Sequence, residues 1–136
     1  MIKLIVGHKG SGKTKKMIDM ANEAARNSKG NVVCVEKGLQ LTYDLSYQVR
    51  LVDVEQYKVS GVDAYYGFLC GLMAGNYDIT DIFCDATLRV VGKDYEAFAG
   101  MIERLMEQTI ASGLVLTFNV SCEPTELPER IRQYVI

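Results

Sequence analysis

The chain has 136 residues, of which 49% are hydrophobic and 24% are charged, the size and composition of one globular domain with a single core. Its formal net charge of −2 argues against nucleic acid as a partner, and no apolar run is long enough to span a membrane. Since the first residues also lack the pattern of a signal peptide, we expect one domain over residues 1–136, located in the cytoplasm.

Strand-like and helix-like segments alternate from the start of the chain. The apolar run Ile2 to Val6 predicts a buried strand, and so does the β-branched stretch Asn31 to Glu36. Between them, residues 13 to 28 carry apolar side chains at helical spacing, and Gly30 provides a stop. This alternation predicts an α/β fold with a mostly parallel sheet.

Residues 39 to 54 show a different pattern, in which apolar and polar residues alternate strictly. The apolar positions are Leu39, Leu41, Tyr43, Leu45, Tyr47, Val49 and Leu51. A period of two indicates extended chain with one face exposed to solvent, but a single strand of this length would be unusual. We therefore expect a short hairpin that turns near residues 44 to 46, with its second arm at about 49 to 54 on the sheet edge.

The second half of the chain continues the alternation. Ser60 can cap a helix that ends near Gly75, with Asp63 placed as in a capping box. The later elements that we expect are a strand over Ile79 to Asp85, a helix over Asp94 to Ser112, a strand over Leu114 to Val120 and a short last strand over Tyr134 to Ile136.

Three glycines, Gly67, Gly71 and Gly75, fall every four residues along one side of the helix after Ser60. Each glycine costs helix stability, so the stripe indicates that another backbone packs closely against it. That backbone could belong to the same domain, to another subunit or to an approaching substrate.

These segments predict a three-layer α/β/α fold with about five strands in the order 5-1-4-3-2. The numbers count, in chain order, the strands that begin at Ile2, Asn31, Ile79, Leu114 and Tyr134. The strand that ends at Asp85 is then separated from the first strand by the Leu114 strand. The hairpin extends the sheet beyond Asn31 to Glu36.

The turn after the first strand has the sequence Gly7, His8, Lys9, Gly10, Ser11, Gly12, Lys13, Thr14. It matches GxxxxGK[ST], in which glycines let the backbone approach an anion and successive amides point into one concavity. The positive end of the following helix adds to this field. We expect Lys13 to contact the β- and γ-phosphates of a nucleotide, and the Thr14 hydroxyl to hold Mg²⁺.

On this motif and its strand–turn–helix context, the sequence resembles the P-loop NTPase superfamily, in its RecA-like branch. It is also similar to small stand-alone bacterial P-loop proteins that are sometimes named as twitching-motility or pilus-retraction ATPases, although it lacks the histidine- and aspartate-rich boxes of those motors. The resemblance implies ATP or another NTP, together with Mg²⁺, as the ligands of a single nucleotide-binding domain.

The resemblance also implies two carboxylates. In P-loop proteins an aspartate at the end of a later apolar strand orients the magnesium, and Asp85 fits this position. Many hydrolysing relatives place a glutamate directly after it, whereas this chain has Ala86. RecA-like ATPases carry a catalytic glutamate at the end of the second strand, which is similar to Glu36 here. The alternative for Asp85 is a solvated aspartate in a turn, and the alternative for Glu36 is an ordinary polar residue at the end of a strand.

Three further residues are candidates for sensing or stabilising the terminal phosphate. In RecA-like relatives a polar group at the end of the fourth strand senses the γ-phosphate, and either Asn119 or Ser121 matches. Arg89, after Asp85, could stabilise charge in the transition state or be a solvated loop residue.

Three functions are compatible with these residues. The first is an ATP- and magnesium-binding protein with slow or partner-stimulated hydrolysis, the second a nucleotide-dependent binding or scaffold module without hydrolysis, and the third a kinase for a small molecule or nucleoside. A protein partner or self-association would fit the first two, and the base preference is not readable from the sequence.

Overall fold

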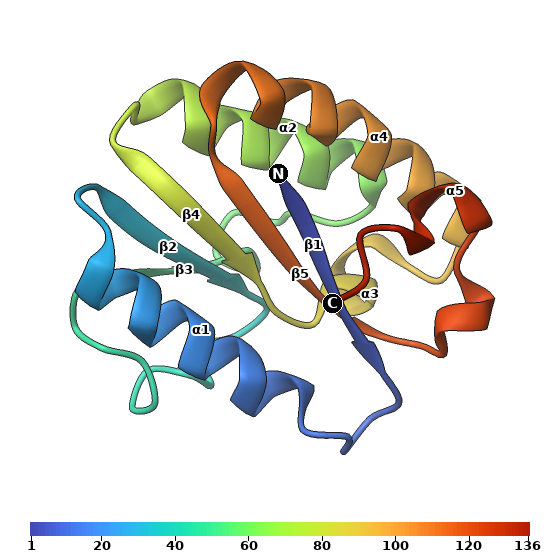
Figure 1. Cartoon of the computed structure of the whole chain (residues 1–136), viewed down its shortest axis with the longest axis horizontal. Coiled ribbons are helices and arrows are strands. Elements are labelled where there is room, and N and C mark those ends of the chain that lie inside the picture. Colours follow the sequence, from blue (N-terminus) through green and yellow to red (C-terminus); the bar gives the residue numbers. More distant parts are fainter.

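The computed structural model describes residues 1–136 as an α/β fold, in which a five-stranded parallel sheet lies between helices (Figure 1). The order across the sheet is β1-β5-β4-β2-β3, and every neighbouring pair is parallel. The strands are β1 (Ile2–Gly7), β2 (Asn31–Glu36), β3 (Val49–Asp53), β4 (Ile79–Cys84) and β5 (Val115–Ser121). All five carboxyl ends therefore lie at one edge of the sheet, where open α/β sheets place their ligands.

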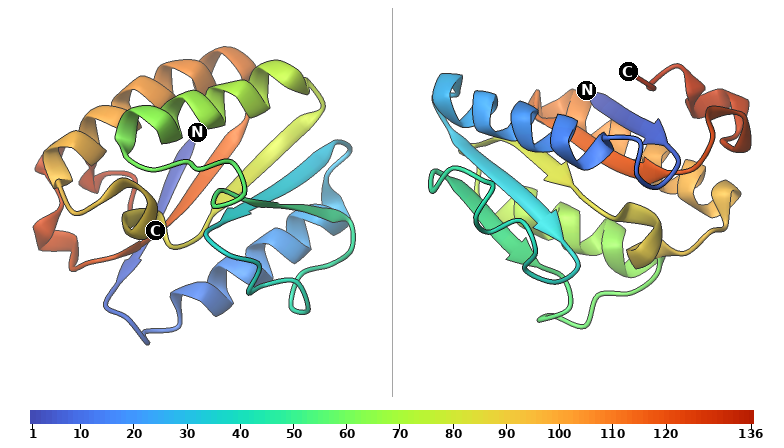
Figure 2. Two further views of the ribbon diagram at one scale, coloured as in Figure 1. Left: turned by 180° about the vertical axis from the view of Figure 1, so that it is seen from behind. Right: turned by 90° about the horizontal axis from the view of Figure 1, so that it is seen from below.

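The helices form unequal outer layers, with one long helix on one face of the sheet and two on the other (Figure 2). They are α1 (Lys13–Asn27), α2 (Val62–Gly75), α3 (Thr87–Val91), α4 (Tyr95–Ser112) and α5 (Glu129–Arg132), with a 3₁₀ turn, η1, at Pro124–Glu126. α1 packs on one face, and α2 and α4 pack on the opposite face. None of these helices is long and apolar enough to cross a membrane.

The core has two parts because the sheet is covered on both faces. A cluster of 26 buried residues, including Leu69, Phe98 and Phe118, lies between the sheet and the α2–α4 layer. A second cluster of 8 buried residues, including Met17, Ala21 and Phe83, lies between the sheet and α1. The α1 face therefore has much less apolar packing than the other face.

The two long helices expected at residues 13 to 28 and 94 to 112 are confirmed. Asp94 caps α4 by accepting a hydrogen bond from the amide of Ala97 at 3.0 Å, and Gly113 ends the helix in the left-handed region. The expected cap at Ser60 is wrong, because the chain enters α2 through Gly61 with φ +90° and no side chain caps the helix. The short helix α3, directly after Asp85, was not expected.

The strand order differs from the expected one at both edges of the sheet. The segment expected as a last strand forms a single parallel bridge, between Leu4 and Val135, instead of a strand. The sheet still has five strands, because β3 lies at the opposite edge beside β2. Between the edges, β5 separates β1 from β4, as expected for the strands before Gly7 and Asp85.

The expected hairpin over residues 39 to 54 is wrong, although its second arm is confirmed as a strand at the sheet edge beside β2. β3 pairs with β2 in parallel, in the register of Val32 with Val49, so residues 37–48 cross over the α1 face and return to the other end of the sheet. The side chain of Asn22 on α1 holds this crossover, since its Nδ2 donates to the carbonyl of Asp44 at 3.0 Å and its Oδ1 accepts from the amide of Ser46 at 2.7 Å.

The period of two in this segment does not match its burial. Leu41 is buried against the α1 cluster and Leu45 packs on it, whereas Tyr43 and Tyr47 are 99% and 95% exposed. All four are apolar positions of the pattern, so only every second one of them contacts the α1 cluster, and the two halves of the crossover do not pair.

The glycine stripe on α2 has no close backbone neighbour within the domain, contrary to one of the expected explanations. A β-carbon added at Gly67, Gly71 or Gly75 would meet no atom within 4 Å. Gly30 is the opposite case, because an added β-carbon would overlap the carbonyl oxygen of Asp78.

We expect these two kinds of glycine to respond to alanine with opposite signs. Gly67→Ala should raise the free energy of unfolding by up to about 1 kcal/mol, since alanine is the better helix former and has room. Gly30→Ala should lower it by about 1–3 kcal/mol, because the backbone must move. Urea unfolding of both variants measures this, and destabilisation by Gly67→Ala would show that the stripe has a contact after all.

Candidate functional site

Residues 7–14 form the turn that joins β1 to α1 at the carboxyl edge of the sheet (Figure 1). Gly10 and Gly12 have φ of 86° and 88°, in the left-handed region that residues with a β-carbon seldom adopt. Gly12 is the N-cap of α1, and no side chain caps the helix there. Gly10 and Gly12 are therefore required by the backbone path of this turn.

The turn leaves several main-chain donors free. Within it, the amide of Ser11 donates to the carbonyl of His8 at 3.2 Å, and the amide of Lys16 donates to that of Gly12 at 3.1 Å. The amides of residues 12 to 15 find no acceptor in the protein. They lie at the positive end of the α1 dipole, so this end of the helix is suited to an anion.

The Lys13 side chain lies within the same turn. The residue is only 8% exposed, and its Nζ donates to the carbonyl oxygen of His8 at 3.0 Å. No carboxylate lies within 4.0 Å of this ammonium group, although Lys15, two residues on, forms an ion pair with Asp19 at 3.1 Å. A buried ammonium with one neutral acceptor keeps donors available for a ligand.

Thr14, Asp85 and Asn119 come together from three distant segments of the chain. The Nδ2 of Asn119 donates to Asp85 Oδ1 at 2.7 Å and to Thr14 Oγ1 at 3.4 Å. Asn119 is 3% exposed, and its Oδ1 is buried without a hydrogen-bond partner. Such an unpaired acceptor is uncommon in proteins and is open to a donor that belongs to a ligand.

Of the two sensor candidates, the structure brings only Asn119 to this group. Ser121 is exposed at the end of β5, in register with Gly7. The alternation of side chains along β5 places both residues on the α1 face, but only Asn119 lies level with Asp85, because Phe118 pairs with Cys84 at the end of the neighbouring strand β4. The sequence indicated both residues, and the strand order selects between them.

Glu36 ends β2 beside Asp85, whose amide donates to the carbonyl of Val35 at 2.9 Å. The glutamate is 2% exposed, and its Oε1 accepts a hydrogen bond from the amide of Leu41 at 3.2 Å. Burial raises the pKa of Glu36, and the charges of Asp85 and Asp53 raise it further, against the lowering effect of the Leu41 and Gln40 amides. In this arrangement the carboxyl group anchors the crossover that follows β2.

We expect Glu36→Gln to change how stability depends on pH. Because the pKa of Glu36 is raised in the folded protein, the folded state holds this proton more tightly than the unfolded state does. The stabilisation is complete below the ordinary value of 4.5 and is lost as pH rises through the raised value. Urea unfolding across this pH range should show a smaller decline in the free energy of unfolding for Glu36→Gln than for the wild-type protein. Equal declines in the two proteins would contradict a raised pKa of Glu36 in the folded state.

The remaining candidates lie at the rim. Arg89 is on the exposed side of α3, and its main-chain oxygen accepts from Lys37 Nζ at 3.3 Å. His8 is exposed, with its Nδ1 3.9 Å from Glu123 Oε1, and Lys9 is exposed beside it. Sequence reasoning missed the strained backbone after Asp85, where Ala86 has φ +51° and caps α3. Nothing in the neighbouring sequence indicates that an alanine will adopt this left-handed conformation.

The side-chain oxygens of Thr14 and Asp85 indicate which kind of cation the site could hold. No group of three or more histidine, cysteine, aspartate or glutamate side chains is arranged to bind a metal ion. Thr14 and Asp85 are joined through Asn119, and together they offer one hydroxyl and one carboxylate. Mg²⁺ usually keeps several waters and takes one or two protein oxygens plus phosphate oxygens, which fits this pair.

Comparison with known proteins adds no assignment, because no protein-family model and no curated protein sequence matches this chain.

Proposed function

We propose that the protein binds a nucleoside triphosphate, ATP or another NTP, with Mg²⁺ in the manner of P-loop NTPases of the RecA-like branch. The observation that carries the proposal is the joint position of two groups of atoms. Free amides and the buried Lys13 ammonium surround the start of α1, and the Thr14, Asp85 and Asn119 cluster lies beside them. The first group suits a polyphosphate and the second suits its cation.

The residues have separate roles in this proposal. The amides of residues 12 to 15 bind phosphate oxygens, and Lys13 turns from the His8 carbonyl to the β- and γ-phosphates. Thr14 and Asp85 hold the cation, which neutralises charge on the phosphates when it is bound. Asn119 keeps Asp85 in position through its 2.7 Å hydrogen bond, and its free Oδ1 accepts from a water of the site.

Hydrolysis by the isolated protein is expected to be slow or to need a partner. A water molecule that attacks phosphate needs a base or an orienting group, and Ala86 follows Asp85 where many relatives have glutamate. Glu36, the other candidate base, is buried and bonded to the Leu41 amide. It can serve only if the crossover after β2 releases it.

The same observation favours a second candidate function, a nucleotide-dependent binding module without hydrolysis. Exposed Arg89 offers no comparable support for a kinase, since its side chain forms no hydrogen bond or ion pair with the site residues.

Calorimetry with ATP and GTP in the presence of Mg²⁺ tests binding, and absence of heat at about 1 mM from folded protein would refute it. Phosphate release then separates the two functions. Turnover that Glu36→Gln abolishes supports slow hydrolysis with Glu36 as base, whereas affinity without turnover supports the binding module. Turnover that Glu36→Gln leaves unchanged would exclude Glu36 as the base.

A further inference from the structure

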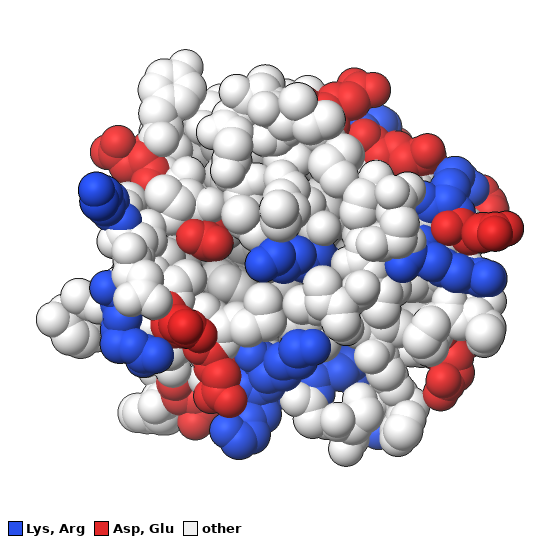
Figure 3. Space-filling model, viewed as in Figure 1, with Lys and Arg blue, Asp and Glu red and all other residues white.

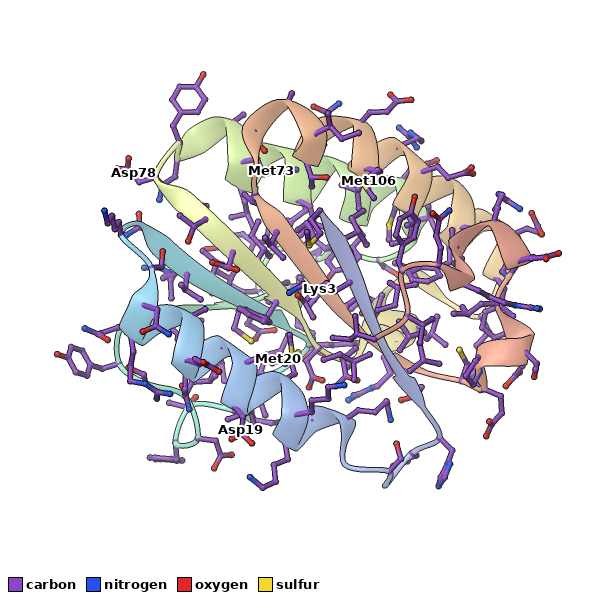
Figure 4. All side chains as sticks on the ribbon, in the orientation of Figure 1. Lys3, Asp19, Met20, Met73, Asp78 and Met106 are labelled. Carbon is purple, nitrogen blue, oxygen red and sulfur yellow. The ribbon has the colours of Figure 1, made fainter.

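The α1 face of the sheet has an open half. The apolar contacts of α1 include Ile5 of β1 together with residues of β2, β3 and β4, and a groove remains between the C-terminal half of the helix and the strands β1, β5 and β4. The groove has a volume of about 280 Å³. In Figure 3 a hollow lies in the middle of this face, with basic and acidic side chains at its sides, and Figure 4 shows Lys3 and Met20 at the groove from facing elements.

Strand register builds the floor of this groove. Lys3 on β1 pairs with Thr117 on β5, and Thr117 pairs with Phe83 on β4, so the three side chains form one row across the sheet. Asp81 lies two residues before Phe83 on the same face. The floor therefore combines an ammonium group, a hydroxyl, an aromatic ring and a carboxylate, and Met20 of α1 forms an apolar wall.

Two polar groups on the floor of the groove, those of Lys3 and Thr117, have no partner in the protein, and Asp81 has one. The Lys3 ammonium makes no hydrogen bond and no ion pair, although Asp81 lines the same groove. The Asp81 carboxylate accepts one hydrogen bond, from the Thr80 hydroxyl at 2.9 Å. Thr117 is 1% exposed and its Oγ1 is buried without a partner. Buried hydroxyl groups are nearly always paired, so Thr117 indicates a missing ligand contact.

We propose that this groove binds a small amphoteric molecule of the α-amino-acid class. Its carboxylate pairs with Lys3 and accepts from the Thr117 hydroxyl, its ammonium group pairs with Asp81, and its apolar side chain packs on Phe83 and Met20. Lys3 and Asp81 line the groove without pairing with each other, and Glu23 of α1 adds a second carboxylate to the lining. Opposite charges in one groove favour a ligand that carries both charges over a simple anion.

The size of the groove agrees with this class. A water molecule occupies about 30 Å³ of liquid, so the groove has the volume of roughly nine water molecules. Leucine and methionine have as many non-hydrogen atoms as that, and bonded atoms lie closer together than separate waters, so either fits, whereas a nucleoside triphosphate is far too large. The groove is thus separate from the site proposed for the triphosphate, and its occupation can be tested without any nucleotide.

The experiment is a calorimetric titration of the whole protein with four probes. L-leucine carries both charges, 4-methylpentanoate lacks the ammonium group, 3-methylbutylamine lacks the carboxylate, and N-acetyl-leucine amide lacks both. We expect leucine or methionine to bind and the three analogues to bind at least about tenfold more weakly, because each loses a charge-assisted hydrogen bond. Equal binding of N-acetyl-leucine amide would overturn the proposal and indicate a peptide segment as occupant.

Two variants test which residue of the groove pairs with each charged group of the ligand. Asp81→Asn should remove the preference for leucine over 4-methylpentanoate, and Lys3→Met should remove the preference for leucine over 3-methylbutylamine. Asp78→Asn and Lys29→Met are matched controls, since both residues are exposed and lie outside the groove. If no probe binds wild-type protein at about 1 mM, or if the controls act like the groove variants, the proposal is wrong.

Discussion

Replacing Lys13 with alanine is expected to weaken Mg–ATP binding by about 10- to 100-fold, because hydrogen bonds from a charged donor contribute about 1.5–3 kcal/mol. Adenosine, which has no phosphate, should be affected much less. Calorimetric titration of both ligands measures the difference. Little loss of fold stability is expected, since the ammonium bonds only to the His8 carbonyl.

Lys16→Ala is the matched control for this variant. Lys16 lies in the first turn of α1 and is exposed, and its side chain has no hydrogen bond in the structure. As a solvated charge near the site, it should change Mg–ATP affinity by less than about threefold. Equal losses in Lys13→Ala and Lys16→Ala, or equal losses for ATP and adenosine, would contradict a specific phosphate contact by Lys13.

Asp85→Asn is expected to remove most of the effect of Mg²⁺ on ATP affinity while leaving the fold intact. Asparagine keeps an oxygen that can accept the 2.7 Å hydrogen bond from Asn119, but it loses the charge that favours a divalent cation. Asp85→Ala loses both, so it should also lower the free energy of unfolding by about 1–3 kcal/mol, because the buried Asn119 amide keeps only the 3.4 Å hydrogen bond to Thr14.

Titrations of ATP with and without Mg²⁺, together with urea unfolding, separate these two effects. Asp81→Asn is the control, since Asp81 lies on the same face of β4 but near the opposite edge of the sheet. It should leave the effect of Mg²⁺ unchanged. If Asp85→Asn keeps the full effect of Mg²⁺, Asp85 is a structural acceptor for Asn119 and holds no cation.

The strand–turn–helix unit around residues 7–14 was readable from the sequence because its determinants are local. An apolar run predicts β1, and helical spacing predicts α1. The structure gives Gly10 and Gly12 positive φ, the conformation for which glycine is the default residue. The same holds for α4, whose cap at Asp94 and stop at Gly113 lie next to the residues that they affect.

Periodicity failed where the partner of a segment came from elsewhere in the chain. In residues 39 to 54 a period of two suggested strand pairing, but the apolar positions of that pattern do not share one environment. Leu41 packs on α1 and Tyr43 is exposed. The Asn22 side chain that holds this crossover lies on a helix, and nothing in the spacing of residues 39 to 54 points to it.

For the candidate site, the sequence by itself determined which residue types stand at the ends of β1, β2, β4 and β5. Only the tertiary structure decided their partners. It joined Asn119 to Asp85 and Thr14, turned Glu36 toward Leu41 and left Ser121 and Arg89 exposed. The physical reason is that backbone pattern depends on near neighbours, whereas a hydrogen bond or an unpaired buried group depends on which distant strands lie side by side.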